Sequence, residues 1–135
     1  MITQQPISAT LPQLVLAQAD VSLATNTAEF LSRLGWDVHV RKTGIDARHL
    51  AHRLSPEVVV LGTDLQGESA WLTCAKLTLL DREQAVVLLA KQVTPEDEAF
   101  ARLVHARDIV AYETQNKDWL TSLSTAWKEQ LMISP

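Results

Sequence analysis

The residues that could bind a metal ion or attack a substrate are few in this chain of 135 residues. His49 and His52 stand three positions apart, a spacing that would present two imidazoles to a metal ion from one face of a helix. No pattern of cysteines or carboxylates nearby completes such a site, and the flanking Arg48 and Arg53 would repel a cation. Cys74, the single cysteine, lies in an apolar stretch and is expected to fill the core. We therefore predict no metal site and no cofactor.

Phosphate-binding and nucleophilic motifs are also missing. The glycines occur singly, at Gly35, Gly44, Gly62 and Gly67, so no glycine-rich loop is available to hold a phosphate group. No nucleophile elbow or catalytic triad is recognisable. The sequence therefore does not predict an enzyme, and any functional site has to be sought where the fold brings residues together.

Apolar runs with strand character alternate along the chain with segments of helical spacing. The runs lie at about 14–17, 36–40, 58–61, 85–90 and 109–111, and the helical segments at about 21–34, 45–54, 68–80, 94–104 and 116–131. Five strand–helix units in succession predict an α/β fold, a parallel sheet with helices on both faces. Trp36, Val38 and Val40 alternate with polar residues, which indicates an edge strand, and the apolar run near residue 60 indicates a central one. A doubly wound sheet of order 2-1-3-4-5 fits this pattern.

The helical spacing also assigns apolar faces to two of these helices. We expect one face of 68–80 to hold Trp71, Leu72, Ala75 and Leu79. Thr94 is a good helix cap, and the helix that follows it is expected to bury Ala99, Phe100, Leu103 and Val104.

Length and composition favour one globular domain. Hydrophobic residues make up 47% of the chain, enough for a core, and 135 residues suit a single domain. We predict a flexible leader at 1–12, the domain at 13–131 and a tail at 132–135. A net charge of −4, with no Lys/Arg run longer than two, argues against nucleic acid and anionic membranes as partners. The sequence shows no signal-peptide pattern and no apolar run of about 18 residues, so we expect a cytoplasmic protein.

The stretch from Pro56 to Gly67 resembles the receiver domain of bacterial two-component response regulators. Receivers typically read Pro-Asp, four apolar residues, the phosphoacceptor Asp, two variable residues and then Leu-Pro-Gly. Here Pro56 and an acidic residue precede the apolar run 58–61, and Leu65 and Gly67 match the ending. The resemblance covers about residues 13–131 and implies a flavodoxin-like receiver fold. It places the phosphoacceptor position on Gly62.

The other chemical positions of a receiver depart from the pattern as well. The resemblance places the acidic pair that holds Mg²⁺ at Gln18 and Ala19, with Asp20 next along the chain. It places the Ser/Thr that ends the fourth strand at Ala90, the Lys that ends the fifth strand at Tyr112, and the aromatic switch residue at Ile109. The sequence thus retains the scaffold and loses the residues of the phosphorylation pocket.

Aspartyl phosphorylation needs a carboxylate nucleophile, a divalent cation and donors to the developing charge. Gly62 has no nucleophile, and Gln18 and Ala19 offer no charge to a hard cation. Asp64 is expected to be a solvated turn residue, because a slip that made it the phosphoacceptor would break the match at 65 and 67. Asp20 has two interpretations, a cap for the first helix or a residual metal ligand.

These departures favour a pseudo-receiver, a module that cannot be phosphorylated and acts through protein contacts in signalling or regulation. Receivers commonly use the fourth helix, fifth strand and fifth helix for output and dimerisation. The expected protein-binding face therefore holds Phe100, Ile109, Tyr112 and Trp119. Tryptophan is a favoured interface anchor where it is half exposed. A homodimer through the last helix is one option.

A small-ligand sensor is the alternative function. Doubly wound sheets bind ligands at the carboxyl ends of their strands. Small residues at Ala19, Gly62 and Ala90 could leave a pocket there, unless Tyr112 fills it. The sequence leaves the partner and the oligomeric state open.

Overall fold

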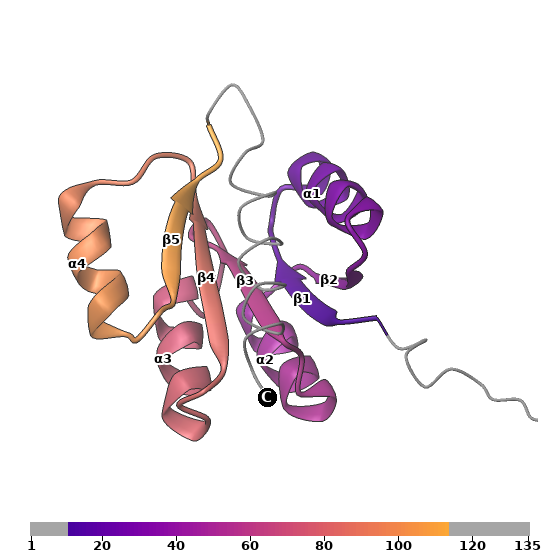
Figure 1. Cartoon of the computed structure of the whole chain (residues 1–135). Helices are drawn as coiled ribbons and strands as arrows, with labels where there is room; N and C mark the ends of the chain where they lie inside the picture. Colours follow the sequence, from indigo (N-terminus) through magenta and orange to yellow (C-terminus); the bar gives the residue numbers. More distant parts are fainter. Residues whose placement is uncertain (1–10, 114–135) are drawn as a thin grey trace, which may run out of the picture.

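The structure is a computed structural model that describes residues 11–113. Five parallel strands form one sheet of order β2-β1-β3-β4-β5 (Figure 1). The strands are β1 (Gln13–Ala17), β2 (Asp37–Arg41), β3 (Val58–Gly62), β4 (Ala85–Ala90) and β5 (Asp108–Ala111). The predicted strand order is confirmed. The predicted last helix, with Trp119, and most of the predicted leader lie outside the described residues.

The helices of the described region begin at side-chain caps. They are α1 (Val21–Arg33), α2 (Gly44–Leu54), α3 (Ala70–Leu80) and α4 (Pro95–Leu103). Each cap accepts a hydrogen bond from a backbone N–H three residues on, and the caps are Asp20, Thr43, Ser69 and Thr94. Such bonds satisfy donors that the first helical turn leaves unpaired, so the helix starts follow from local sequence. Among the described residues, no helix is both long and apolar enough to cross a lipid bilayer.

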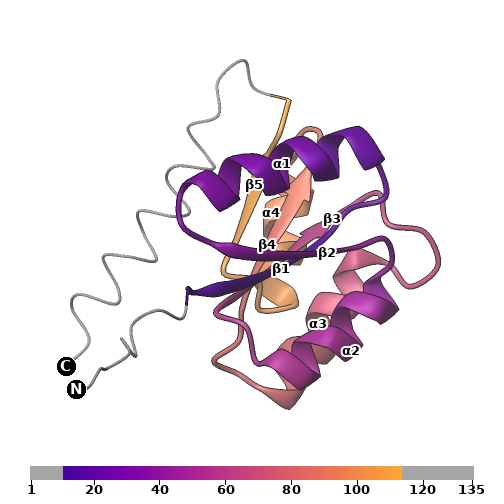
Figure 2. The ribbon, with the colours of Figure 1, turned by 90° about the vertical axis from the view of Figure 1, so that its right-hand side faces the viewer.

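Two hydrophobic cores lie on opposite faces of the sheet. Residues of α2, α3 and α4 pack with Val15 and Val59 on one face, which we call the α2–α4 core. On the other face Leu31 and Trp36 pack with Leu14 and Val60 in the α1 core. Figure 2 shows α1 on one side of the sheet and α2 and α3 on the other. The strands β3 and β4 are buried along their whole length because both faces are covered.

Two predicted helix faces are wrong in part, since Val104 is buried as predicted and Trp71 and Ala75 pack partly buried against the α2–α4 core. In α3 the buried residues are Ala70, Thr73, Cys74, Leu77 and Thr78, whereas Leu72 and Leu79 are exposed. In α4 Ala101 is buried, and Ala99, Phe100 and Leu103 are exposed. The spacing misled for α3 because threonines occupy its buried side and leucines its outer side. Thr78 can be buried since its hydroxyl donates to the carbonyls of Cys74 and Val104, both at 3.0 Å.

Cys74 fills the α2–α4 core as expected. The residue is fully buried. Burial raises the pKa of its thiol to about 11, so the sulfur is the neutral thiol at neutral pH and not a nucleophilic thiolate.

Candidate functional site at the carboxyl edge of the sheet

The strand register brings the predicted pocket residues together at the carboxyl edge. Ala17 pairs with Leu61, and the residues that follow them are Gln18 and Gly62. Farther along the sheet, Ala90 pairs with Ala111, and the N–H of Tyr112 donates to the Ala90 carbonyl at 2.8 Å. Four of the positions inferred from the receiver pattern, Gln18, Gly62, Ala90 and Tyr112, therefore lie at the ends of β1, β3, β4 and β5, at one edge of the sheet.

The side chain of Gln18 occupies the space beside Gly62. Gln18 is only 1% exposed, and its Oε1 accepts a hydrogen bond from the Asp20 backbone N–H at 3.1 Å. A Cβ added at Gly62 would stand 2.6 Å from Gln18 Nε2 and 3.1 Å from its Cδ. Real Cβ atoms essentially never approach a heavy atom within 3.0 Å. The carboxamide thus fills the place from which a side chain at position 62 would project.

The two aspartates at this edge have ordinary structural surroundings. Asp20 caps α1, because its Oδ1 accepts the Leu23 N–H at 2.9 Å, in agreement with the first of its two interpretations. Asp64 is exposed in the turn after β3, where the Leu65 N–H donates to the Gly62 carbonyl at 3.3 Å. No group of three or more His, Cys, Asp or Glu residues within 11–113 is arranged to hold a metal ion.

Tyr112 lies beside this edge without replacing the side chain missing at 62. Its ring is partly buried against the α1 core. Burial, and next the negative charge of Asp64, raise the pKa of Tyr112, so its phenol is protonated at neutral pH. The atoms nearest to a Cβ at position 62 belong to Gln18 and Asp64; that Tyr112 fills the pocket stays a prediction.

The described members of the predicted protein-binding face lie on both sides of the sheet. Phe100 is 43% exposed on α4, and Ile109 packs against the α2–α4 core. Tyr112 packs against the α1 core on the opposite face, and Trp119 lies outside the described residues. Of the three described residues, Phe100 exposes a large apolar side chain.

The sequence reasoning placed Phe100 on a binding face and missed the other exposed apolar residues of α3 and α4. The rings of Trp71 and Phe100 stack across the two helices with centroids 4.8 Å apart. On the same helices Leu72, Leu79 and Leu103 are 47%, 78% and 70% exposed. We call these five residues the α3–α4 surface. The helical spacing assigned all of them to apolar faces, and only the packing shows which side of each helix is outward. Exposed leucines on two helices that share a stacked aromatic pair are a candidate interaction site.

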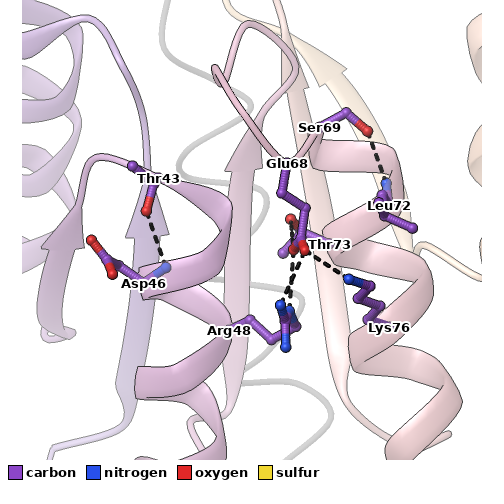
Figure 3. A network of polar contacts seen from close by, with 8 residues as sticks. All are labelled: Thr43, Asp46, Arg48, Glu68, Ser69, Leu72, Thr73 and Lys76. Carbon is purple, nitrogen blue, oxygen red and sulfur yellow. Dashed lines mark hydrogen bonds and ion pairs between the residues drawn. The ribbon is translucent and has the colours of Figure 1, made fainter.

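The loop that leaves this edge after β3 is anchored at Glu68 (Figure 3). Its carboxylate accepts hydrogen bonds from Arg48 Nη2 at 3.0 Å, from Thr73 Oγ1 at 2.7 Å and from Lys76 Nζ at 2.9 Å. Burial by itself raises the pKa of Glu68, but the hydrogen bonds from Arg48, Thr73 and Lys76, together with the charge of Arg48, outweigh it and lower the pKa from 4.5 to about 2. This network ties the loop to α2 and α3. Arg48, Thr73 and Lys76 stand 20, 5 and 8 residues from Glu68 in the sequence, so no short motif predicts the network.

His49 and His52 lie exposed on α2 and line a surface hollow of about 710 Å³ together with Arg41, Arg53 and Leu80, among others. None of the four positions at the carboxyl edge lines this hollow. The hollow is therefore separate from the predicted pocket at that edge.

No model of a protein family matches the chain, and no curated protein matches it. Solved structures do match the chain. The BeF₃-activated DrrB receiver domain matches with a TM-score of 0.77 and 23% identity over 89% of this chain and 99% of its own. A CheY-like receiver domain protein from Methanospirillum hungatei matches with a TM-score of 0.82 and 14% identity over 93% of this chain and 100% of its own. The BeF₃-activated receiver domain of Klebsiella pneumoniae RstA matches with a TM-score of 0.78 and 22% identity, over 86% and 98%. This chain has the fold of the response regulator receiver domains.

Proposed function

We propose that this chain is a pseudo-receiver, a module that accepts no phosphoryl group and acts in signalling or regulation by binding another protein. One observation carries the proposal: Gly62 ends β3 where the receiver pattern has its nucleophile, and the Gln18 carboxamide stands against it. Without a carboxylate at this point, no acyl phosphate can form there, and a neutral amide does not replace the charge that a hard cation needs. On this proposal the chain is not an enzyme.

Protein binding is the role that remains for such a scaffold. The α3–α4 surface supports it, because its stacked aromatic rings and three exposed leucines are the kinds of side chain that anchor interfaces. A net charge of −4 favours a protein partner over nucleic acid or an anionic membrane. Without a phosphoryl switch, the concentration of the partner sets the extent of binding.

Substituting both Leu79→Ser and Leu103→Ser is expected to abolish partner binding and leave the fold intact. Both side chains are mostly exposed, at 78% and 70%, so their loss should change the free energy of unfolding by less than about 0.5 kcal/mol each. The measurement is affinity capture from the source cells, with the wild-type chain and the variant as baits. Light scattering of the two baits reports whether a second copy of the chain is the partner.

Val21→Ser is the matched control, since Val21 is 62% exposed on α1, away from this surface. A partner retained by wild type and by Val21→Ser, and lost by the double variant, supports the proposal. Equal retention by all three baits contradicts binding through the α3–α4 surface.

The small-ligand sensor has less support. Gln18 and Ala90 are 1% and 4% exposed, and the Gln18 side chain fills the space beside Gly62. A ligand at this edge would have to displace that side chain from a fully packed position.

A further inference from the structure

We infer that Gln18 and Gly62 are an interlocked pair, in which Gln18 is a built-in occupant of the degenerate pocket and excludes every side chain from position 62. The inference deepens the proposed function and rests on it, because it states how the pocket is kept closed. It also predicts that no single substitution at position 62 reopens the pocket.

The backbone does not explain why position 62 is a glycine. Within 11–113, the glycines with positive φ are Gly35 and Gly67, so Gly62 has a conformation open to other residues. It lies at the end of a fully buried strand, where a glycine weakens the strand relative to a residue with a side chain. Space is therefore the constraint, and the nearest atom to an added Cβ is Gln18 Nε2, at 2.6 Å.

Gln18 is held in this position from both ends. Its backbone N–H donates to the Arg41 carbonyl at 3.1 Å, which fixes the residue against β2. Its side-chain Oε1 accepts the N–H of Asp20, and Asp20 in turn caps α1. The far end of a long side chain can usually move aside at small cost, but this one is 1% exposed and bonded to the turn that starts a helix. A Cβ at position 62 must therefore disrupt that turn or the packing around it.

Packing holds the Gln18 amide in place together with the hydrogen bond from Asp20. Gln18 Nε2 is buried and has no hydrogen-bond partner among the described residues. A buried donor without an acceptor is costly, so the amide is not placed here by its own hydrogen bonds alone. Filling the volume beside Gly62 is the remaining gain from this arrangement, because an empty space there would cost packing contacts.

A double-mutant cycle tests the interlock, with Gly62→Ala, Gln18→Ala and the variant that carries both, each measured by its urea unfolding midpoint. Gly62→Ala alone is expected to lower the midpoint because of the clash with Nε2. In the Gln18→Ala background the same substitution is expected to leave the midpoint unchanged or to raise it, since the clash is gone and a strand gains a side chain. The loss of the destabilisation by Gly62→Ala in that background is the signature of the pair.

A lowering of the midpoint by Gly62→Ala that is equal in both backgrounds would overturn the inference. If Gly62→Ala does not fold, folding of the variant with both substitutions supports the interlock, and its failure to fold contradicts it. Gly62→Ala combined with Asp64→Ala is the matched control, because Asp64 Oδ1 lies 3.0 Å from the same Cβ position. If Asp64→Ala removes the destabilisation by Gly62→Ala and Gln18→Ala does not, the obstruction is Asp64, and the inference is wrong.

The interlock and the proposed function fail in different experiments. An additive cycle would refute the pairing of Gln18 with Gly62 and leave the absence of a nucleophile untouched. Phosphorylation of the wild-type chain would refute the pseudo-receiver proposal, whatever the cycle shows.

Discussion

Glu68→Gln is expected to lower the free energy of unfolding at pH 7 by about 2 kcal/mol, because it removes a carboxylate that accepts several charge-assisted hydrogen bonds. The Glu68 side chain is 6% exposed and lies 3.0 Å from Arg48 Nη2 and 2.9 Å from Lys76 Nζ. The uncharged amide of glutamine cannot balance the positive charges of Arg48 and Lys76. Urea unfolding of the wild type and the variant measures the difference.

The same residue sets part of the dependence of stability on pH. Its pKa in the folded chain, about 2, is below the ordinary value of 4.5. The folded state therefore holds this carboxylate ionised more strongly than the unfolded state does, and the resulting stability is present above pH 4.5. It is lost progressively as the pH falls from 4.5 toward about 2. The difference in the free energy of unfolding between wild type and Glu68→Gln should accordingly become smaller as the pH falls through this range.

Glu29→Gln is the matched control for this prediction, since Glu29 is an exposed glutamate on α1. We expect Glu29→Gln to change the unfolding midpoint little at pH 7 and at pH 2.5. A difference between wild type and Glu68→Gln that stays constant from pH 7 to pH 2.5 would contradict the role assigned to the network.

Gly44→Ala is expected to destabilise the chain by about 2 kcal/mol, although alanine is normally the better helix former. Gly44 begins α2, and a Cβ there would stand 2.2 Å from Thr73 Oγ1 and 3.1 Å from the Glu68 carbonyl oxygen. The first residue of α2 thus packs directly against α3 and the loop before it. Thermal unfolding of the variant measures the loss.

Thr73→Ala supplies the control background, because it removes the hydroxyl that an alanine at position 44 would meet. The cost of Gly44→Ala should be smaller in that background than in the wild type. An unchanged or increased melting temperature for Gly44→Ala alone would show that α2 and α3 can separate without cost, and the prediction would be wrong.

The parts of the fold that depend on local pattern were predictable from sequence. The alternation at Trp36, Val38 and Val40 predicted that β2 lies at the sheet edge. The continuous apolar run of β3 predicted that this strand lies inside the sheet. The cap at Thr94 was visible because its hydrogen bond joins residues three apart. Each of these features is set by neighbouring residues in the chain.

The features that depend on tertiary packing were not predictable in this way. The outward side of α3 could not be read from spacing, because the helix has apolar residues on its outer side as well as its inner side. The position of the Gln18 amide depends on the space left by Gly62, 44 positions later in the sequence. The resemblance predicted residues that lie at the carboxyl edge of the sheet, and only the side-chain packing showed that Gln18 occupies the space beside Gly62.

The most direct test of the pseudo-receiver proposal is the intact mass of the wild-type chain after incubation with acetyl phosphate and Mg²⁺. A receiver domain that carries its phosphoacceptor aspartate serves as the positive control in the same experiment. We expect the control to gain the mass of one phosphoryl group and this chain to gain none, because position 62 has no nucleophile. A gain of one phosphoryl group that disappears in Asp64→Asn would contradict the proposal, and it would show that the carboxylate two residues after Gly62 is the phosphoacceptor.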